Sequence, residues 1–341
     1  MTSIEWCRNA DGSAGKSWNP IRARNLSTGA IGWHCEHVHE GCRNCYAERH
    51  NEKRFGTGLP YKPGHRGDIE IYLDEKTLLA PLGWRKPQRV FVCSMTDLFG
   101  EWVTDAWRDR ILAVMSLCPR HTFIVLTKRP RRMRDYFRAL DDTSALDDRI
   151  ASLVRARRDD EDICLGIRPN LWLLVSCSEQ KDADEFIPLV LDTPAAVRGV
   201  SCEPLLGPIE LSRYLVTGDT RPLRWVIAGG ESGPGARPMH LEWARSLHDQ
   251  CAAAGVPFFF KQWGAWCPHK IEPGGDLGGD VRAGRVRIVH PTGQSDVEVF
   301  ISTGGRSTLP GSLYMARLGK KAAGRLLDGR EHSEWPQGAA R

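Results

Sequence analysis

Three cysteines lie close together in the stretch GWHCEHVHEGCRNCYAERH, which spans residues 32–50. Cys35, Cys42 and Cys45 follow the spacing C-x6-C-x2-C, and four histidines share the same nineteen positions. Thiolates and imidazoles bind soft metals, and neighbouring thiols also support redox chemistry. In a chain without a secretion signal, such a group favours a metal or redox site over structural disulfides.

A structural zinc ion is one interpretation of this loop. Zinc takes four ligands, and in proteins these often come in paired spacings. Cys42 and Cys45 form one C-x2-C pair, but no second pair follows in the chain. The remaining ligands would be chosen from Cys35, His34, His37 and His39.

A redox disulfide and an iron–sulfur cluster are the other two interpretations. Thioredoxin-like disulfides belong to a small βαβ domain, whereas this loop precedes a large α/β pattern. A four-iron cluster is fully ligated by four thiolates, so three thiolates leave one iron open to an exogenous ligand. The segment after Cys45 starts a helix, and its exposed amides would stabilise thiolates and an anionic cluster.

The composition is that of a soluble globular protein. The 341 residues are 41% hydrophobic and 26% charged, which suits one large α/β domain or two ordinary domains. Residues 1–12 contain no apolar signal core, and no stretch has the length of a membrane span, so we expect a cytoplasmic protein. The net charge of +5 permits a nucleic-acid partner without requiring one. Most of the other eight cysteines sit singly in apolar runs and are expected to fill the core.

A repeated pattern of short apolar runs followed by polar residues predicts the fold. Such near-continuous runs are typical of buried parallel strands. They occur in SIEW at 3–6, RVFVCSMTD, TFIVLTKRP, LWLLVSCSEQ, VRGVSCEPL, RWVIAGGESG and PFFFKQWG. Candidate helices between them cover 105–117, 130–140, 181–192 and 240–254.

This alternation predicts an α/β fold with a parallel (β/α) barrel, partial and of six to seven strands, and a small C-terminal β annex. A doubly wound open sheet is the alternative. We divide the chain into a barrel-like domain at 1–266, which includes the loop 32–50, and a Gly-rich annex with a basic tail at 267–341. Within the annex, the runs VRIVH and VEVFI predict a β-hairpin. In either architecture the polar residues at the carboxyl ends of the strands line the active site.

Several motifs together resemble a family of phage and bacterial proteins that is known by its three-Cys motif and is largely of unknown function. The motifs are WNP at 18–20, GCRNCYAER at 41–49, FVCSMTDLFGEWV at 91–103, VLTKRPRRM at 125–133, SCEPLLGPI at 201–209, GGESGPGARPM at 229–239, PFFFKQWG at 257–264 and GKKAAGRLLDGR at 319–330. The resemblance covers residues 1 to about 335. The family is related at a distance to radical S-adenosylmethionine (SAM) enzymes, which carry a three-cysteine loop at the start of a barrel.

The resemblance implies that Cys35, Cys42 and Cys45 ligate three irons of a [4Fe–4S] cluster and that SAM chelates the fourth. Reduction would then cleave SAM to methionine and a 5′-deoxyadenosyl radical. This sequence departs from the usual radical SAM spacing of C-x3-C-x2-C, and its aromatic residue, Tyr46, follows the last cysteine instead of preceding it. The departure bears on SAM cleavage more than on cluster binding.

Strand-end positions supply the candidate contacts to SAM. Small residues allow a close backbone approach, and polar ones could bind its hydroxyl, amino or carboxylate groups. The candidates are Ser176, Ser201, Glu203, Gly229, Gly230, Glu231 and Lys261. No catalytic residue is assigned.

A basic stretch at 127–138 is a candidate phosphate or nucleic-acid contact, although a solvated helix face has the same composition. The residues concerned are Lys128, Arg129, Arg131 and Arg132. We therefore expect a radical SAM-like enzyme acting on an unknown substrate, with nucleic acid or a nucleotide as candidates. Its partners would be an electron donor such as flavodoxin or ferredoxin and a candidate partner protein, with no membrane. The alternative is a zinc-stabilised nucleic-acid-binding phage protein without catalytic activity.

Overall fold

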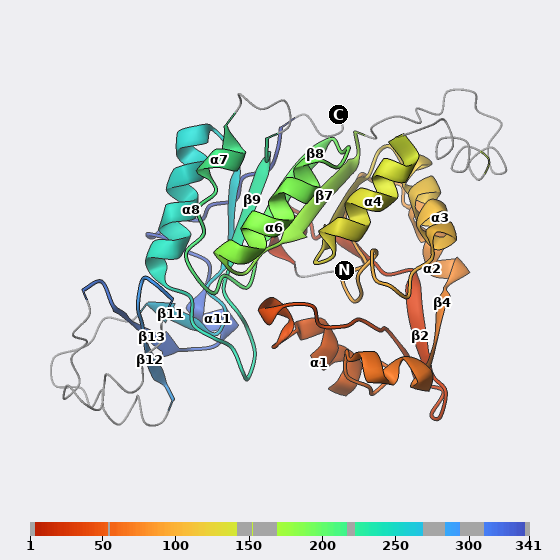
Figure 1. The fold of residues 1–341 in the computed structure, drawn as a ribbon, viewed down its shortest axis with the longest axis horizontal. Helices are drawn as coiled ribbons and strands as arrows, with labels where there is room; N and C mark the ends of the chain where they lie inside the picture. Colours follow the sequence, from red (N-terminus) through yellow and green to blue (C-terminus); the bar gives the residue numbers. More distant parts are fainter. Residues whose placement is uncertain are drawn as a thin grey trace. The chain divides into compact units, whose positions relative to one another are not determined.

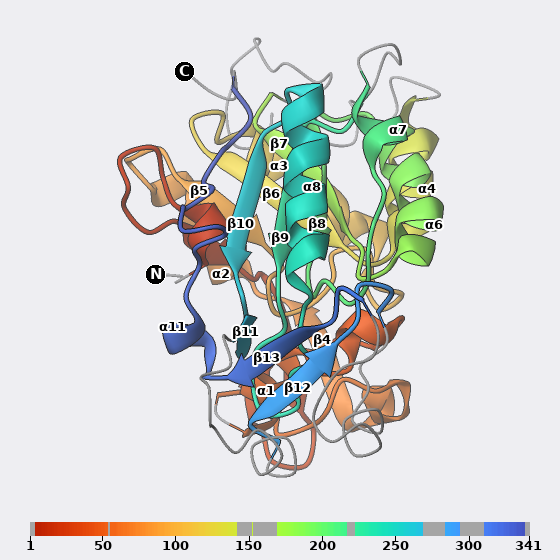
Figure 2. The same cartoon turned by 90° about the vertical axis from the view of Figure 1, so that its left-hand side faces the viewer.

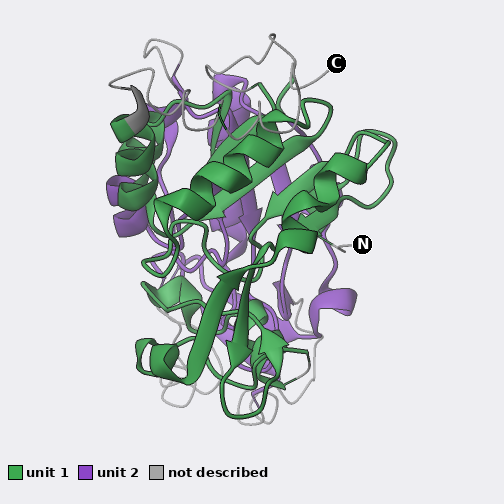
Figure 3. Cartoon of the chain, turned by 90° about the vertical axis from the view of Figure 1, so that its right-hand side faces the viewer, with its two compact units in different colours: residues 1–175, 186–199, 336–341 green, residues 176–185, 200–335 purple. Residues whose placement is uncertain are grey.

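The structure is a computed structural model, and it describes residues 4–53, 55–141, 152, 169–216, 222–268, 284–293 and 310–337. The chain divides into two compact units, shown in Figure 3. Unit 1 comprises Met1–Val175, Phe186–Gly199 and Pro336–Arg341, and unit 2 comprises Ser176–Glu185 and Val200–Trp335. The run VEVFI at 297–301, which was predicted to form a hairpin with VRIVH, lies outside the described residues.

One seven-stranded sheet contains six of the seven predicted strands, together with β1, which was not predicted. Its order is β1-β5-β6-β7-β8-β9-β10, so successive strands are added in one direction. The strands are β1 (Lys16–Trp18), β5 (Arg89–Val92), β6 (Thr122–Thr127), β7 (Leu171–Ser176), β8 (Val197–Cys202), β9 (Trp225–Gly229) and β10 (Phe258–Gln262). The pairs β1–β5, β5–β6, β6–β7 and β9–β10 are parallel. A doubly wound sheet would reverse its order at a switch point. The observed order is that of a partial (β/α) barrel, which confirms the predicted fold class.

Burial explains why these runs become strands. Every residue of β7, β8 and β9 is buried, as expected when both faces of a parallel sheet are covered. The helices are α1 (Tyr46–Lys53), α2 (Glu75–Leu79), α3 (Asp105–Ser116), α4 (Pro130–Asp141), α6 (Gln180–Leu191), α7 (Ser212–Leu215), α8 (Leu241–Ala254) and α11 (Lys320–Ala323). The four predicted helices correspond to α3, α4, α6 and α8, each within one or two residues of its expected ends.

Two small antiparallel sheets complete the fold. In unit 1, β2 (Ile21–Asn25) pairs with β3 (Ile31–Gly32) and β4 (Ile69–Leu73). These strands and α1 lie together in Figure 1, and all of them are inserted between β1 and β5 in the sequence. In unit 2, β13 (Leu313–Arg317) pairs with β11 (Trp266–Pro268) and β12 (Val286–Val289), which form the predicted C-terminal β annex.

One expectation about local structure needs correction. SIEW is not the first strand, because Glu5–Cys7 forms a 3-10 helix with Trp6 and Cys7 buried, and the first strand is Lys16–Trp18. The run VRIVH forms β12, which pairs with β13 among the described residues. The short strands β1 and β11 were not predicted, because three residues carry no readable periodicity.

In unit 2 the C-terminal segment covers the edge of β10 (Figure 2). Phe260 N donates to His332 O at 3.0 Å, and the Trp225 indole donates to Glu334 O at 2.9 Å. Trp335 also packs edge-on against Phe259, with 5.2 Å between the ring centroids. The exposed edge of a sheet is an unpaired row of amides and carbonyls, so this segment satisfies part of it.

Candidate functional site

The cysteine loop lies in unit 1, between β3 and α1. All three thiols are free, Cys42 is buried, and Cys35 and Cys45 are half-buried. A single 3-10 turn, Glu40–Cys42, precedes Cys45, and α1 begins at Tyr46. The loop therefore follows the first strand of the barrel sheet and precedes the second, β5.

The three thiols interact with one another electrostatically. Burial raises the pKa of the Cys35 thiol, and the nearby Cys45 and Cys42 add to that rise. Burial also raises the pKa of Cys45, while the backbone amides of Glu48 and Ala47 and the Lys128 ammonium act in the opposite direction. These amides belong to the first turn of α1. Stabilisation of the Cys45 thiolate by such amides was predicted from the sequence. The charges of the loop sulfurs therefore influence one another, and the first amides of α1 can donate hydrogen bonds to a Cys45 thiolate.

Asn51 holds the two ends of the loop together. Its side-chain oxygen accepts from Trp33 N at 2.8 Å and from Thr57 N at 3.2 Å, and its side-chain nitrogen donates to Thr57 Oγ1 at 2.8 Å and Leu59 O at 2.9 Å. A Cβ atom on Gly32 would lie 2.3 Å from the Asn51 oxygen. This buried asparagine therefore fixes the backbone just before Cys35 to the helix that follows Cys45.

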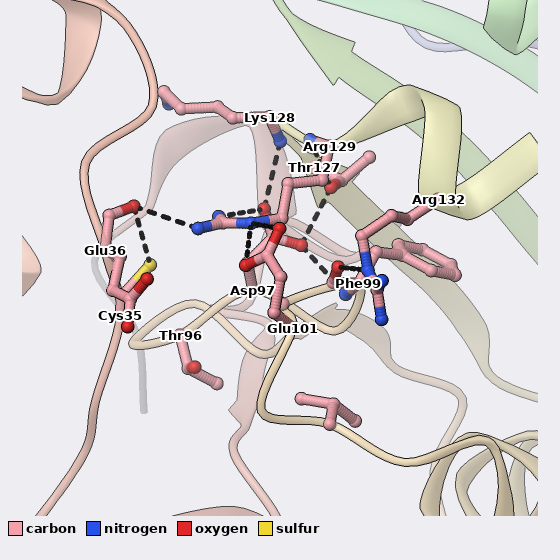
Figure 4. Close-up of polar contacts among 12 residues, drawn as sticks. Cys35, Glu36, Thr96, Asp97, Phe99, Glu101, Thr127, Lys128, Arg129 and Arg132 are labelled. Carbon is pink, nitrogen blue, oxygen red and sulfur yellow. Dashed lines mark hydrogen bonds and ion pairs between the residues drawn. The ribbon is translucent and has the colours of Figure 1, made fainter. Parts of the chain in front are cut away.

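The Asp97 side chain connects the segments that follow β5 and β6, beside Cys35 and Glu36 (Figure 4). Its carboxylate is buried and accepts from the Thr127 hydroxyl at 2.8 Å, from Phe99 N at 2.9 Å and from Lys128 N at 3.1 Å. A carboxylate that accepts this many hydrogen bonds is a rigid, preformed element. The Thr96 hydroxyl donates to His34 O, so the same segment also contacts the loop directly.

Arg129 connects this network to Cys35. Its side chain is only 5% exposed, and its Nε atom lies 3.0 Å from a Glu101 carboxylate oxygen. The Nη1 atom lies 3.4 Å from Asp97, and Nη2 donates to Glu36 O at 3.2 Å. The guanidinium also lies over the Trp102 ring, 4.8 Å from its centroid. Arg129 is therefore a buried cation beside the loop, and its contact to phosphate stays a prediction.

The histidines of the loop are held by other partners. His34 Nε2 lies 3.1 Å from Glu36, whose carboxylate also binds Arg66 at 2.8 Å. His37 Nε2 lies 2.8 Å from Glu48, and His39 Nδ1 accepts from Gly41 N at 3.0 Å. Across the described part of the chain, no group of three or more His, Cys, Asp and Glu side chains is placed to hold a metal ion.

The predicted SAM contacts all lie in unit 2, and four of them lie close together. Lys261 Nζ lies 2.5 Å from a Glu203 oxygen, and both side chains are less than one-fifth exposed. The Ser176 hydroxyl donates to Glu203 O at 3.1 Å, and a Cβ on Gly229 would lie 3.5 Å from the Glu203 carboxyl carbon. These residues end β7, β8, β9 and β10, so they form one polar group at the strand ends.

The remaining three candidates differ in their surroundings. The Ser201 hydroxyl is buried and makes no hydrogen bond to any described residue. Glu231 is buried and binds Arg237 through two side-chain contacts of 2.7 and 2.9 Å. Gly230 packs against the backbone of Trp263, where an added Cβ would lie 2.0 Å from the carbonyl oxygen. Glu231 and Gly230 thus have fixed neighbours in the loop after β9, and their contact to SAM stays a prediction.

The basic stretch is partly neutralised. Arg132 is half-buried and donates to Phe99 O at 2.9 Å, and Arg134 binds Asp135 at 2.6 Å. Arg138 binds Asp192 at 2.5 Å, whereas Arg131 is exposed on α4. Of the predicted phosphate contacts, Arg131 is therefore the exposed one and Lys128 is half-buried beside Cys45.

Sequence reasoning did not single out Asp97, Glu36 or Asn51 as parts of the site. Asp97 was visible as the polar end of a strand, which is a general signal of an active-site edge. Asn51 and Glu36 gave no such signal, because their partners are backbone atoms and side chains that only the folded chain brings near.

Comparison with known proteins places the chain in a family. The family described as "Protein of unknown function (DUF5131)" matches residues 1–336. No curated protein and no solved structure matches the chain. Within the described residues, no helix has both the length and the apolar character needed to cross a bilayer.

Proposed function

We propose that this chain, which belongs to the DUF5131 family, binds a [4Fe–4S] cluster through Cys35, Cys42 and Cys45. The observation that carries the proposal is that three free thiols lie in one loop after the first barrel strand. Such a cluster brings its own iron and sulfide, so three thiolates suffice and one iron keeps an open position. The loop histidines already have partners, which favours ligation by sulfur alone.

The chain's own contribution is a prearranged loop. The Asn51 hydrogen bonds fix its ends, Arg129 fixes the carbonyl after Cys35, and the first amides of α1 face Cys45. Ligation requires that the thiols lose their protons, and burial raises the pKa of Cys35 and Cys45. Cluster assembly should therefore release protons and become more favourable as the pH rises.

Metal and sulfide analysis after anaerobic purification tests the proposal. We expect about four irons and four sulfides per chain in the wild type and their loss in Cys42→Ala. Cys267→Ala is the matched control, because Cys267 is a half-buried thiol on β11. About one zinc and no sulfide would overturn the proposal and favour the zinc-stabilised binding protein.

We further propose that the protein is a radical SAM-like enzyme, with the polar group around Glu203 and Lys261 as the contact to SAM. A bound cluster and SAM would together supply a 5′-deoxyadenosyl radical. Lys261 offers a cation for the SAM carboxylate, and Glu203 offers an acceptor for its amino group. The proposed substrate is a nucleic acid or a nucleotide. The proposed electron donor is a flavodoxin or a ferredoxin.

A dithionite-driven assay for 5′-deoxyadenosine tests this second step. We expect Lys261→Ala to lose 5′-deoxyadenosine formation while keeping its iron, and Lys181→Ala, at an exposed site of the same unit, to keep both. A loaded wild-type protein that never forms 5′-deoxyadenosine would leave a cluster protein without SAM chemistry. For the substrate class, charge reversal of Arg131 and Arg132 should weaken nucleic-acid binding.

A further inference from the structure

The Cys35 thiol and the Arg129 guanidinium converge on one backbone oxygen. Cys35 Sγ donates to Glu36 O at 3.9 Å, and Arg129 Nη2 donates to the same oxygen at 3.2 Å. Figure 4 shows this carbonyl between the sulfur and the guanidinium. A buried cation is thus held one residue away from a proposed cluster ligand.

Two carboxylates form ion pairs with the Arg129 guanidinium. Asp97 is buried and lies 3.4 Å from Arg129 Nη1, while Glu101 is 43% exposed and lies 3.0 Å from Nε. The Asp97 oxygens are fixed by two backbone amides and one hydroxyl, so this charge cannot move away. Both signs of charge therefore stand at fixed positions near Cys35, in surroundings where salt screens little.

These fixed charges lie beside the Cys35 sulfur. Cys35 and Arg129 donate to the same carbonyl oxygen, and Asp97 in turn contacts Arg129. Fixed charges beside a ligand sulfur also act on an electron added there, because that electron places negative charge at the same site.

We propose that Arg129 and Asp97 set, with opposite signs, the midpoint reduction potential of the cluster bound by Cys35, Cys42 and Cys45. This inference rests on the proposed function. The process is the one-electron reduction of the cluster by a low-potential donor, which adds one negative charge to the site. Net charge and hydrogen bonding around the sulfurs are known determinants of such potentials. Arg129 therefore favours reduction, and Asp97 opposes it.

Redox titration of the loaded protein, followed by electron paramagnetic resonance, tests this inference. Arg129→Gln should lower the midpoint potential, and Asp97→Asn should raise it. Glu101→Gln should raise it by a smaller amount, and it provides a variant that folds readily because the side chain is nearly half exposed. Arg129→Lys keeps the charge and should restore most of the wild-type potential. Arg110→Gln is the matched control, since this arginine binds the exposed Glu75 on another helix.

The opposite signs distinguish electrostatic control from loosening of the loop. Loosening would move every variant in the same direction, because greater exposure to water has one effect on the potential. Shifts of one sign, or fully loaded variants with unshifted potentials, would overturn the inference alone. A wild-type protein that binds no cluster would overturn the proposed function, and this inference with it.

Discussion

Replacement of Asn51 by alanine should destabilise unit 1 far more than an ordinary surface substitution. The side chain is 1% exposed and makes four hydrogen bonds, two as acceptor and two as donor. Alanine leaves the Trp33 and Thr57 amides and the Leu59 carbonyl without this partner. Each buried group that is left unsatisfied costs about 1–3 kcal/mol. The Thr57 hydroxyl also loses Asn51 as a partner, but it retains a contact of 3.3 Å with Leu59 N. We therefore expect a loss of about 3–5 kcal/mol, a large share of a typical net stability.

Urea unfolding measures this loss, and thiol alkylation mapped by mass spectrometry measures its location. The structure places Trp33 two residues before Cys35, so Asn51→Ala should also speed alkylation of that cysteine in the protein without cluster.

Two further variants complete the test of Asn51. Glu52→Ala changes the next, exposed residue of α1 to the same residue type and should cost less than about 0.5 kcal/mol. Thr57→Val removes only one of the four bonds and should cost about 1 kcal/mol. If Asn51→Ala costs no more than Thr57→Val, the reasoning that these bonds act together is refuted.

Three other predictions follow from the core and from buried polar groups. Gly230→Ala should lower the midpoint of thermal unfolding sharply, because its Cβ would lie 2.0 Å from the Trp263 carbonyl oxygen; an unchanged midpoint would contradict this packing. Tyr136→Phe should cost about 1–3 kcal/mol in urea unfolding, since its hydroxyl donates at 2.7 Å to the buried carboxylate of Asp109. Burial raises the pKa of Cys7 to about 12, so the unfolded chain loses this proton first as pH rises. Stability from this thiol should therefore be complete below about pH 8.5 and fall by about 1.4 kcal/mol per pH unit well above it. Unfolding curves between pH 7.5 and 10.5 would check this slope, which Cys7→Ala should reduce.

The sequence alone predicted most of the strand and helix pattern, and the strand order in the structure then decided between a partial barrel and a doubly wound sheet. Runs such as FIVL and LWLLV are apolar at every position, and in the structure they lie in β6 and β7, where every residue but Leu126 is buried. This agreement is physical, because a parallel strand covered on both faces hides such a run from water. Short elements such as β1 were not predictable, because three residues cannot show a period and pair only through tertiary contacts.

The sequence also determined which three thiols could form a site, because their spacing of six and two residues keeps them in one loop. Only the tertiary structure decided what surrounds them. Arg129 was grouped with exposed phosphate contacts, since a basic run is usually solvated. In the folded chain it is buried between Asp97 and Glu36 O, which lie 32 and 93 residues away in sequence. Hydrogen bonds and ion pairs of this range depend on chain topology, and local periodicity carries no record of them.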